Sequence, residues 1–563
     1  MPKIYRVAIK IRSIACVNLI MNLISRLLLV CILLALAGYI RLVWQQRHGT
    51  QAIPGLPVIG PVAAPTIAPG QAPEGRLIGL ETALPDETIP PETIPPEAIH
   101  GERVIHFSSR EQYVNYVQAL ADAGLAALGQ IDSLRVLRVS DDVLRQLQPG
   151  SYGGQPHFAY RVERPSEPSL NVDPAQYGEL RAFGQSARSI VGGLIEGDGA
   201  GVLVGILDSG IATHAQFDQI NHVQLDLIGS AISDSAAAHG TAVASIITGS
   251  EGIAPAAELF VVRVLDEAGR GNSFHVAQGI VQAVDRGAKV LNLSLGLYQD
   301  TQLLREAVQY AHAHNVLMVA AAGNDGYARM PYPAAYPQVL SVTAVDGLGR
   351  QALFPNQSES IDFAAPGVGV LTAQPDEGSQ WFSGTSAAAP FVSGTLAALL
   401  SADASRSSPE VVELIRHALD EAGAPGADPL YGDGLVNWER LRERNIAGLL
   451  DVALAEIYLP PDALPGTTMP VEVMVQNRGT AWLTTATLTV QVGASAPQQF
   501  IVGTLGPGQT STRTVYTQVP SINSSTSLNI AAQVLPEEPI DDVRLGNNQK
   551  AVFFRALRSS MDD

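Results

Sequence analysis

The chain has 563 residues and a formal net charge of −19, which predicts two to four folded units at about 100–200 residues per domain. An acidic chain repels phosphate, so the charge argues against nucleic-acid binding and against a general affinity for anionic membranes. Cys16 and Cys31 are the only cysteines, which excludes a disulfide framework, a cysteine–zinc site and a cysteine nucleophile after residue 31.

The first 44 residues have the pattern of a targeting segment. An uncharged apolar run covers residues 27–40 and follows basic residues at positions 3, 6, 10, 12 and 26. The run is shorter than the about 20 residues of a spanning helix, and Ala35 and Ala37 form an A-x-A cleavage pattern. If Arg41 snorkels, the apolar stretch extends to Trp44. Residues 1–44 are therefore a cleaved signal peptide or an anchor through residues 27–44. Both outcomes predict export, either to the medium or periplasm or to the outer side of a membrane.

Three segments precede the largest predicted domain. Residues 45–100 are rich in proline and contain ETIPPETIPPEAIH, which indicates an extended linker. Residues 101–148 predict a small β-α-β unit, with strands at 103–107 and 134–139 and a helix at 111–124. Residues 149–195 show no strong period, so we expect a connector.

Residues 196–445 alternate short apolar strands with amphipathic helices. The expected strands cover residues 202–207, 259–265, 290–293, 316–320 and 339–345. The expected helices cover residues 242–248, 273–286 and 301–314. This alternation predicts an α/β domain with a doubly wound, mostly parallel sheet and a site at the carboxyl ends of its strands. Residues 451–556 instead carry short β-type runs separated by Gly and Pro, which predict an immunoglobulin-like β-sandwich.

Three motifs of the α/β domain carry candidate catalytic side chains. Asp208 ends the buried strand of VLVGILDSG, and His239 precedes the expected helix in HGTAVASIIT. Ser386 opens a helix in FSGTSAAAP. A serine hydroxyl needs a base within hydrogen-bond reach, which His239 can supply. Asp208 can orient the imidazole and stabilise its charged form.

A fourth motif, VAAAGN, places Asn324 after a strand. Its amide can donate a hydrogen bond to an oxyanion, and the N-terminus of the Ser386 helix can donate a second one. Gly384 allows a close approach of the backbone beside Ser386.

These four motifs, in this order, resemble the subtilisin-like serine proteases. Further similar motifs are GIAP, RVLD, NLSLG, DFAAPG and YGDGLVN, at residues 252–255, 263–266, 292–296, 362–367 and 431–437. The resemblance implies a serine endopeptidase of broad specificity that acts on polypeptides through an acyl-enzyme. It implies Asp208, His239 and Ser386 as the catalytic triad and Asn324 as the oxyanion donor. It also implies six pocket-wall residues for the side chain before the cut bond: Ser294, Leu295, Gly296, Ala321, Ala322 and Gly323.

The pattern departs from the family at two places, residues 214–217 and Ser245, which puts details of the cleft in doubt. The resemblance implies no cofactor for the chemistry. Structural calcium is an expectation without assigned ligands, because solvated loop aspartates explain Asp218, Asp226 and Asp234 more simply. We interpret the other histidines, at positions 214, 222, 275, 312 and 314, as surface or packing residues, and we expect a monomer.

The two flanking units also show resemblances. The β-α-β unit resembles the inhibitory propeptide that precedes many subtilases, and the alternative is a permanent N-terminal domain. The C-terminal unit resembles the bacterial cell-adhesion-related β-sandwich in its turn signals, among them PG at 465–466, NRG at 477–479 and GPG at 506–508. For this unit, substrate or surface binding and a stabilising role stay open as alternatives.

Overall fold

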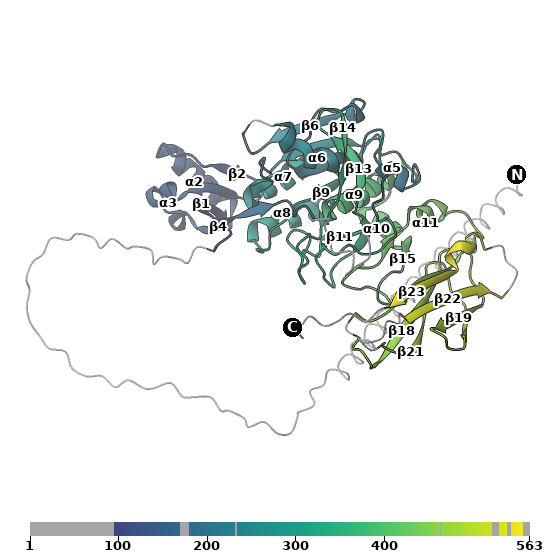
Figure 1. The fold of residues 1–563 in the computed structure, drawn as a ribbon. Coiled ribbons are helices and arrows are strands. Elements are labelled where there is room, and N and C mark those ends of the chain that lie inside the picture. Colours follow the sequence, from purple (N-terminus) through teal and green to yellow (C-terminus); the bar gives the residue numbers. More distant parts are fainter. Residues whose placement is uncertain are drawn as a thin grey trace, which may run out of the picture. The chain divides into compact units, whose positions relative to one another are not determined.

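The computed structural model describes residues 95–168, 180–230, 233–461, 463–520, 528–537 and 542–554 (Figure 1). The expected targeting segment, residues 1–44, and most of the expected linker lie outside the described residues.

The N-terminal unit is an antiparallel sheet with two helices. In chain order it contains β1 (Ala98–Phe107), α2 (Arg110–Asp122), β2 (Gly129–Ile131), β3 (Val136–Ser140), α3 (Asp141–Gln146), a 3-10 turn (Pro149–Tyr152) and β4 (Gly154–Glu163). The strand order is β2-β3-β1-β4, and β8 (Arg270–Asn272) of the next domain extends it. Two expectations were wrong here, because β1 starts inside the expected linker and β4 lies in the expected connector. Pro156 and exposed polar residues conceal the period of β4, and pairing with β1 and β8 fixes it as a strand.

The sheet of this unit is apolar on both faces. On β1, Ile105 and Phe107 pack with α2, whereas Val104 packs in the apolar cluster that contains α7 (Ser273–Asp285) and α8 (Gln302–Ala313). On β3, Leu137 packs on the α2 side and Val136 packs in the cluster that contains α7 and α8. The unit therefore shares one half of its core with the domain that follows.

The central domain contains a nine-stranded sheet in the order β15-β16-β12-β11-β10-β9-β5-β7-β6. Among the described residues, the strand pairs of this sheet are all parallel except β15 with β16. This confirms the predicted α/β class. The strands are β5 (Leu203–Asp208), β6 (His222–Asp226), β7 (Glu258–Arg263), β9 (Val290–Leu293), β10 (Leu317–Ala321), β11 (Val339–Val345), β12 (Phe363–Pro366), β15 (Leu419–Asp420) and β16 (Leu435–Val436).

Helices cover both faces of this sheet. One face packs with α6 (Asp234–Ile247), α9 (Thr385–Ala402) and α10 (Ser408–Arg416), and the other with α7 and α8. α6 begins before the predicted start at residue 242, so His239 lies inside the helix rather than before it. α5 (Ala187–Ile190), a 3-10 turn (Ala215–Phe217), the hairpin of β13 (Val370–Gln374) and β14 (Gly378–Phe382), and α11 (Trp438–Glu443) complete the domain.

Among the described residues, α9 is the one helix long and apolar enough to cross a membrane. Its apolar window is 83% buried inside the structure, which is typical of a core helix.

The C-terminal unit consists of two antiparallel sheets around one apolar cluster, which confirms the predicted sandwich. One sheet contains β17 (Val452–Tyr458), β18 (Thr468–Asn477) and β21 (Thr510–Gln518). The other contains β20 (Gln498–Val502), β19 (Ala486–Val492), β22 (Leu528–Pro536) and β23 (Gln549–Phe554). A 3-10 turn (Leu545–Asn547) precedes β23.

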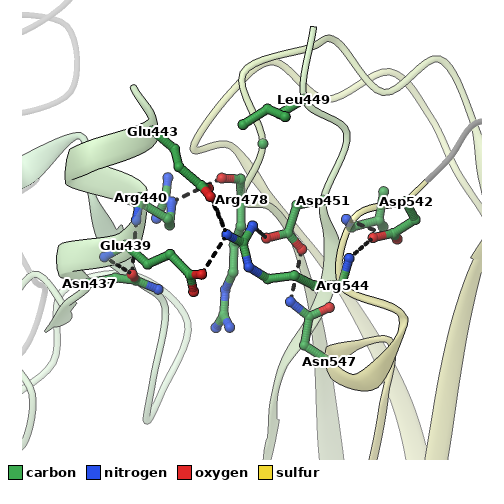
Figure 2. A network of polar contacts seen from close by, with 12 residues as sticks. Asn437, Glu439, Arg440, Glu443, Leu449, Asp451, Arg478, Asp542, Arg544 and Asn547 are labelled. Atoms are coloured by element: carbon green, nitrogen blue, oxygen red, sulfur yellow. Dashed lines mark hydrogen bonds and ion pairs between the residues drawn. The ribbon is translucent and has the colours of Figure 1, made fainter. Parts of the chain in front are cut away.

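A polar network joins this sandwich to α11, as Figure 2 shows. Arg544, in the segment before β23, pairs with Glu439 and Glu443 of α11 at 2.9 and 2.7 Å. The same guanidinium pairs with Asp451 at 2.9 Å. Arg440 of α11 donates to the carbonyl oxygen of Arg478 at 3.3 Å. These contacts hold the sandwich directly against the α/β domain.

Candidate active site

Asp208 and His239 form a buried pair at the carboxyl end of β5. His239 Nδ1 lies 2.8 Å from Asp208 Oδ1 and 3.0 Å from Oδ2. Asp208 is fully buried and His239 is 5% exposed. The Ser209 N–H donates to Asp208 Oδ1 at 2.7 Å, and the ring of Phe382 packs edge-on against the imidazole at 5.3 Å. The carboxylate and the phenyl ring together fix the plane of the imidazole.

Ser386 is the second residue of α9, close to the predicted position at a helix start. The N-cap is Gly384, whose φ of +128° is strained for other residues. The first turn of a helix has free N–H groups and a positive dipole end, which suit a developing negative charge. Ser386 is 2% exposed, and no hydrogen bond among the described residues reaches its Oγ. The expected bond from this hydroxyl to His239 is thus not formed in this state.

Asn324 follows β10 and has a fixed orientation. Its Oδ1 accepts hydrogen bonds from the N–H of Thr385 at 2.9 Å and from the Thr385 hydroxyl at 2.8 Å. Its Nδ2 therefore points away from Thr385, and a Cβ built at Gly384 would lie 2.8 Å from it. Thr385 was not predicted as a site residue, because its role depends on this contact.

The six expected wall residues take two kinds of position. Gly296 and Gly323 line a cavity of about 520 Å³, together with Ser166, Tyr298, Asp325 and Pro331. The other four are buried: Ser294, Leu295, Ala321 and Ala322. The Ser294 hydroxyl donates to the carbonyl oxygen of Ser386 at 3.3 Å. Gly296 and Gly323 therefore bound this cavity, which is also lined by residues of the segment that ends at Ser166.

A segment of the same chain, residues 161–168, occupies the cleft. Arg161, Val162 and Glu163 of β4 pair antiparallel with β8. Glu163 also exchanges two backbone hydrogen bonds with Gly296, at 3.0 and 2.9 Å. An extended strand bound between two edges by its backbone is a sequence-tolerant mode of peptide recognition.

The end of this segment lies at the candidate oxyanion donor. The carbonyl oxygen of Ser166 accepts a hydrogen bond from Asn324 Nδ2 at 2.9 Å, and the Ser166 hydroxyl donates to Asp325 Oδ1 at 3.2 Å. A Cβ built at Gly384 would lie 3.7 Å from Pro168 Cδ, so the segment continues past the start of α9. No local pattern in the sequence predicts this placement, because it depends on a contact between residues more than 150 positions apart.

The arrangement combines a base held by a carboxylate, a hydroxyl at a helix N-terminus and an oriented amide donor. Such a set can transfer an acyl group from a peptide to the serine. Within the described ranges, no group of three or more His, Cys, Asp or Glu could hold a metal ion. Asp226, one of the aspartates considered for calcium, instead pairs with the buried Arg263 at 3.1 Å.

This chain is similar to known proteins in two of its domains. A model described as "Subtilase family" matches residues 199–434, and a model described as "CARDB" matches residues 450–552. Subtilisin BL from Lederbergia lenta is 37% identical over 247 residues, which are 43% of this chain and 90% of that protein. An alkaline protease from Shouchella clausii is 37% identical over 43% of this chain and 64% of its own length. A solved structure of the prenylagaramide maturation protease is 32% identical, covers 43% of this chain and 92% of that chain, and has a TM-score of 0.39.

Proposed function

This chain belongs to the subtilase family of serine endopeptidases, and we propose that Ser386, His239 and Asp208 are its catalytic residues. The observation that supports this most is the buried His239–Asp208 pair, with Ser386 at the start of α9 in the same domain. The chemistry requires no organic cofactor.

The residues have distinct roles in the proposed reaction. Ser386 Oγ attacks the carbonyl carbon of the peptide bond, and His239 Nε2 takes the hydroxyl proton. Asp208 stabilises the imidazolium that forms. Asn324 Nδ2 and the N–H of Ser386 stabilise the oxyanion. His239 then gives the proton to the leaving amine, and water hydrolyses the acyl-enzyme by the same route.

Casein hydrolysis tests these roles. Wild type should hydrolyse casein, and Ser386→Ala should lose nearly all of this activity while keeping its fold. Ser405→Ala is the matched control, because Ser405 is exposed and lies away from the site. Equal activity of Ser386→Ala and wild type would remove Ser386 from the mechanism, and an inert matured wild type would favour a binding protein that kept the fold.

We further propose that the N-terminal unit is an inhibitory propeptide. Its last residues occupy the cleft beside Gly296, and Ser386 is nearly inaccessible in this state. A substrate would have to displace this segment before reaching the serine. The unit is larger than residues 101–148, because β4 belongs to the same sheet.

The bond that we propose for self-cleavage joins Ser166 and Glu167. The Ser166 carbonyl oxygen already contacts the oxyanion donor Asn324. Attack by Ser386 Oγ would form an ester to the Ser166 carbonyl carbon, break the bond to the Glu167 nitrogen and pass the proton through His239 to that nitrogen. Water would then release the Ser166 carboxylate.

Mass spectrometry of the mature chain tests the propeptide and its cleavage site together. Wild type should yield a chain that begins at Glu167, and Ser386→Ala should stay uncut. An active wild type that begins before Glu102 would contradict the propeptide. A beginning elsewhere between residues 150 and 195 would contradict only the chosen bond.

Three further points are proposals with their own support. The basic start and the apolar run at 27–44 favour export, with or without an anchor, and the mature N-terminus would decide between the two. The small, uncharged predicted wall residues favour broad specificity for apolar or aromatic residues before the cut bond, with small residues such as Ser166 also accepted; strict cleavage after Arg or Lys in a peptide library would contradict it. A monomer is the expected state, which light scattering would test.

A further inference from the structure

A histidine lies at the contact between the N-terminal unit and the α/β domain. His275, in the first turn of α7, faces Arg138 of β3, with Arg138 Nη1 2.9 Å from His275 Nε2. A guanidinium has no acceptor and stays protonated, so Nε2 must be the acceptor and the imidazole must be neutral. This bond exists only while His275 carries no proton on Nε2.

The other groups around His275 are few. Asn272, the N-cap residue of α7, accepts the His275 N–H on its Oδ1. Its Nδ2 lies 3.1 Å from His275 Nδ1, but the two make no hydrogen bond, because Nδ1 carries the ring proton when Nε2 is the acceptor. From β6, Asp226 is the nearby carboxylate, but it already pairs with Arg263. Behind Arg138, Glu102 of β1 lies 3.6 Å from its Nε.

Arg138 is itself held in a fixed place. Its guanidinium lies 5.5 Å from the centre of the Phe274 ring, and its side chain is 13% exposed. If His275 became charged, a small rotation of the Arg138 side chain would therefore not separate the two cations. Two charges this close, and partly removed from water, repel strongly.

We propose that protonation of His275 expels Arg138 and loosens the N-terminal unit from α7, so that acidification uncovers the active site. This inference rests on the proposed inhibitory role of that unit. The N-terminal unit would then be held at neutral pH and released at acidic pH.

The direction follows from linkage. Burial, and then the charge of Arg138, lower the pKa of His275 from 6.5 to about 4, against a smaller opposing effect of Asp226. When the unit leaves, Arg138 leaves too, and the pKa rises toward its ordinary value. The separated state therefore binds more protons, and lower pH favours it between about pH 6.5 and about pH 4. From about pH 7 to about pH 5, opening should increase by up to about 20-fold.

A second histidine contact crosses the same boundary. His106 Nδ1 lies 3.2 Å from Glu306 Oε2 of α8. His157 packs edge-on against His106 at 5.0 Å, and its pKa is lowered by burial and then by His106. The test must therefore isolate His275 rather than follow pH alone.

Hydrogen exchange of the full chain carrying Ser386→Ala measures opening without self-cleavage. The reporters are the N–H of Glu163, bonded to Gly296 at 3.0 Å, and the N–H of Arg164, bonded to Gly269 at 2.9 Å. Peptides from β18 and β21 correct for the pH dependence of intrinsic exchange. Opening at Glu163 and Arg164 should rise by up to about 20-fold from about pH 7 to about pH 5.

Adding His275→Gln, which cannot be charged, should remove this rise, and Arg138→Gln should reduce it. His312→Gln is the control and should keep the rise, since His312 is an exposed histidine on α8. The inference is overturned if His275→Gln keeps the full rise or if the parent shows none. Exchange in β18 and β21 reveals any variant that has unfolded. If His275→Gln unfolds, Arg138→Gln tests the inference in its place, and an undiminished rise in that variant would overturn it. Casein hydrolysis by wild type tests the proposed function separately, because the exchange experiment needs no catalysis.

Discussion

Replacing Arg544 with alanine should destabilise the junction between the sandwich and α11 (Figure 2). Arg544 pairs with three carboxylates, and its pKa reflects them: burial lowers it, but the bonds to Glu439, Glu443 and Asp451 outweigh burial and raise it. Asp451 is 2% exposed and would lose its only salt bridge among the described residues. The Asn547 amide would still donate to it at 2.8 Å.

The loss of unfolding free energy can be estimated from the burial of the three carboxylates. Leaving a buried carboxylate unpaired costs about 3–5 kcal/mol, whereas the partly exposed Glu439 and Glu443 each contribute about 0–1 kcal/mol. Because Asn547 compensates in part, we expect a loss of about 3 kcal/mol and a fall in Tm on the order of 10 °C.

Calorimetry in the Ser386→Ala background, where self-digestion is absent, measures this loss. Arg145→Ala is the matched control, because Arg145 and its partner Asp142 are 68% and 76% exposed. The control should change Tm little. Equal shifts for the two variants would refute the reasoning and would indicate that the Arg544 network does not stabilise the junction.

Two predictions concern the oxyanion donor. Asn324→Ala should lower kcat by about 10²–10³-fold with little change in KM, measured with a chromogenic peptide, because the donated bond is stronger to the oxyanion of the transition state than to the neutral carbonyl of the substrate; an unchanged kcat would exclude the role. Thr385→Val should lower kcat by about tenfold, since one of the two bonds that orient Asn324 Oδ1 is lost, and Thr385→Ser should retain it; equal losses in both Thr385 variants would point to packing instead.

The sequence predicted the strands that have a clear apolar run. β9 and β11 begin and end at the predicted residues. Strands such as β4 and β16 have no such run. Their backbone pairing comes from neighbours that are distant in the chain, β8 for β4 and β12 for β16, and a local pattern cannot contain that information.

In the candidate site, too, local sequence patterns predict some features, whereas others depend on contacts between distant parts of the chain. Asp208 and His239 were expected to pair because their motifs resemble those of the family, and they do pair although His239 lies inside α6 rather than before it. The role of Thr385 depends on the rotation of one amide, and the placement of Ser166 depends on how two units pack. The sequence predicted His275 only as a surface or packing residue. Its proposed role depends on the contact with Arg138, which lies more than 100 positions away in the chain.

If the N-terminal unit is the inhibitor proposed above, its two-faced sheet would make its detachment irreversible. While docked, the face with Val104 and Val136 is covered by α7 and α8, and the face with Ile105 and Phe107 by α2. Once detached, the unit keeps only the second half of its core, and a domain of this size has little stability to lose. It would then spend most of its time unfolded, and unfolded chain is the material that an endopeptidase cuts. Each molecule that opens would destroy its own inhibitor, so a brief exposure to acid would have a lasting result.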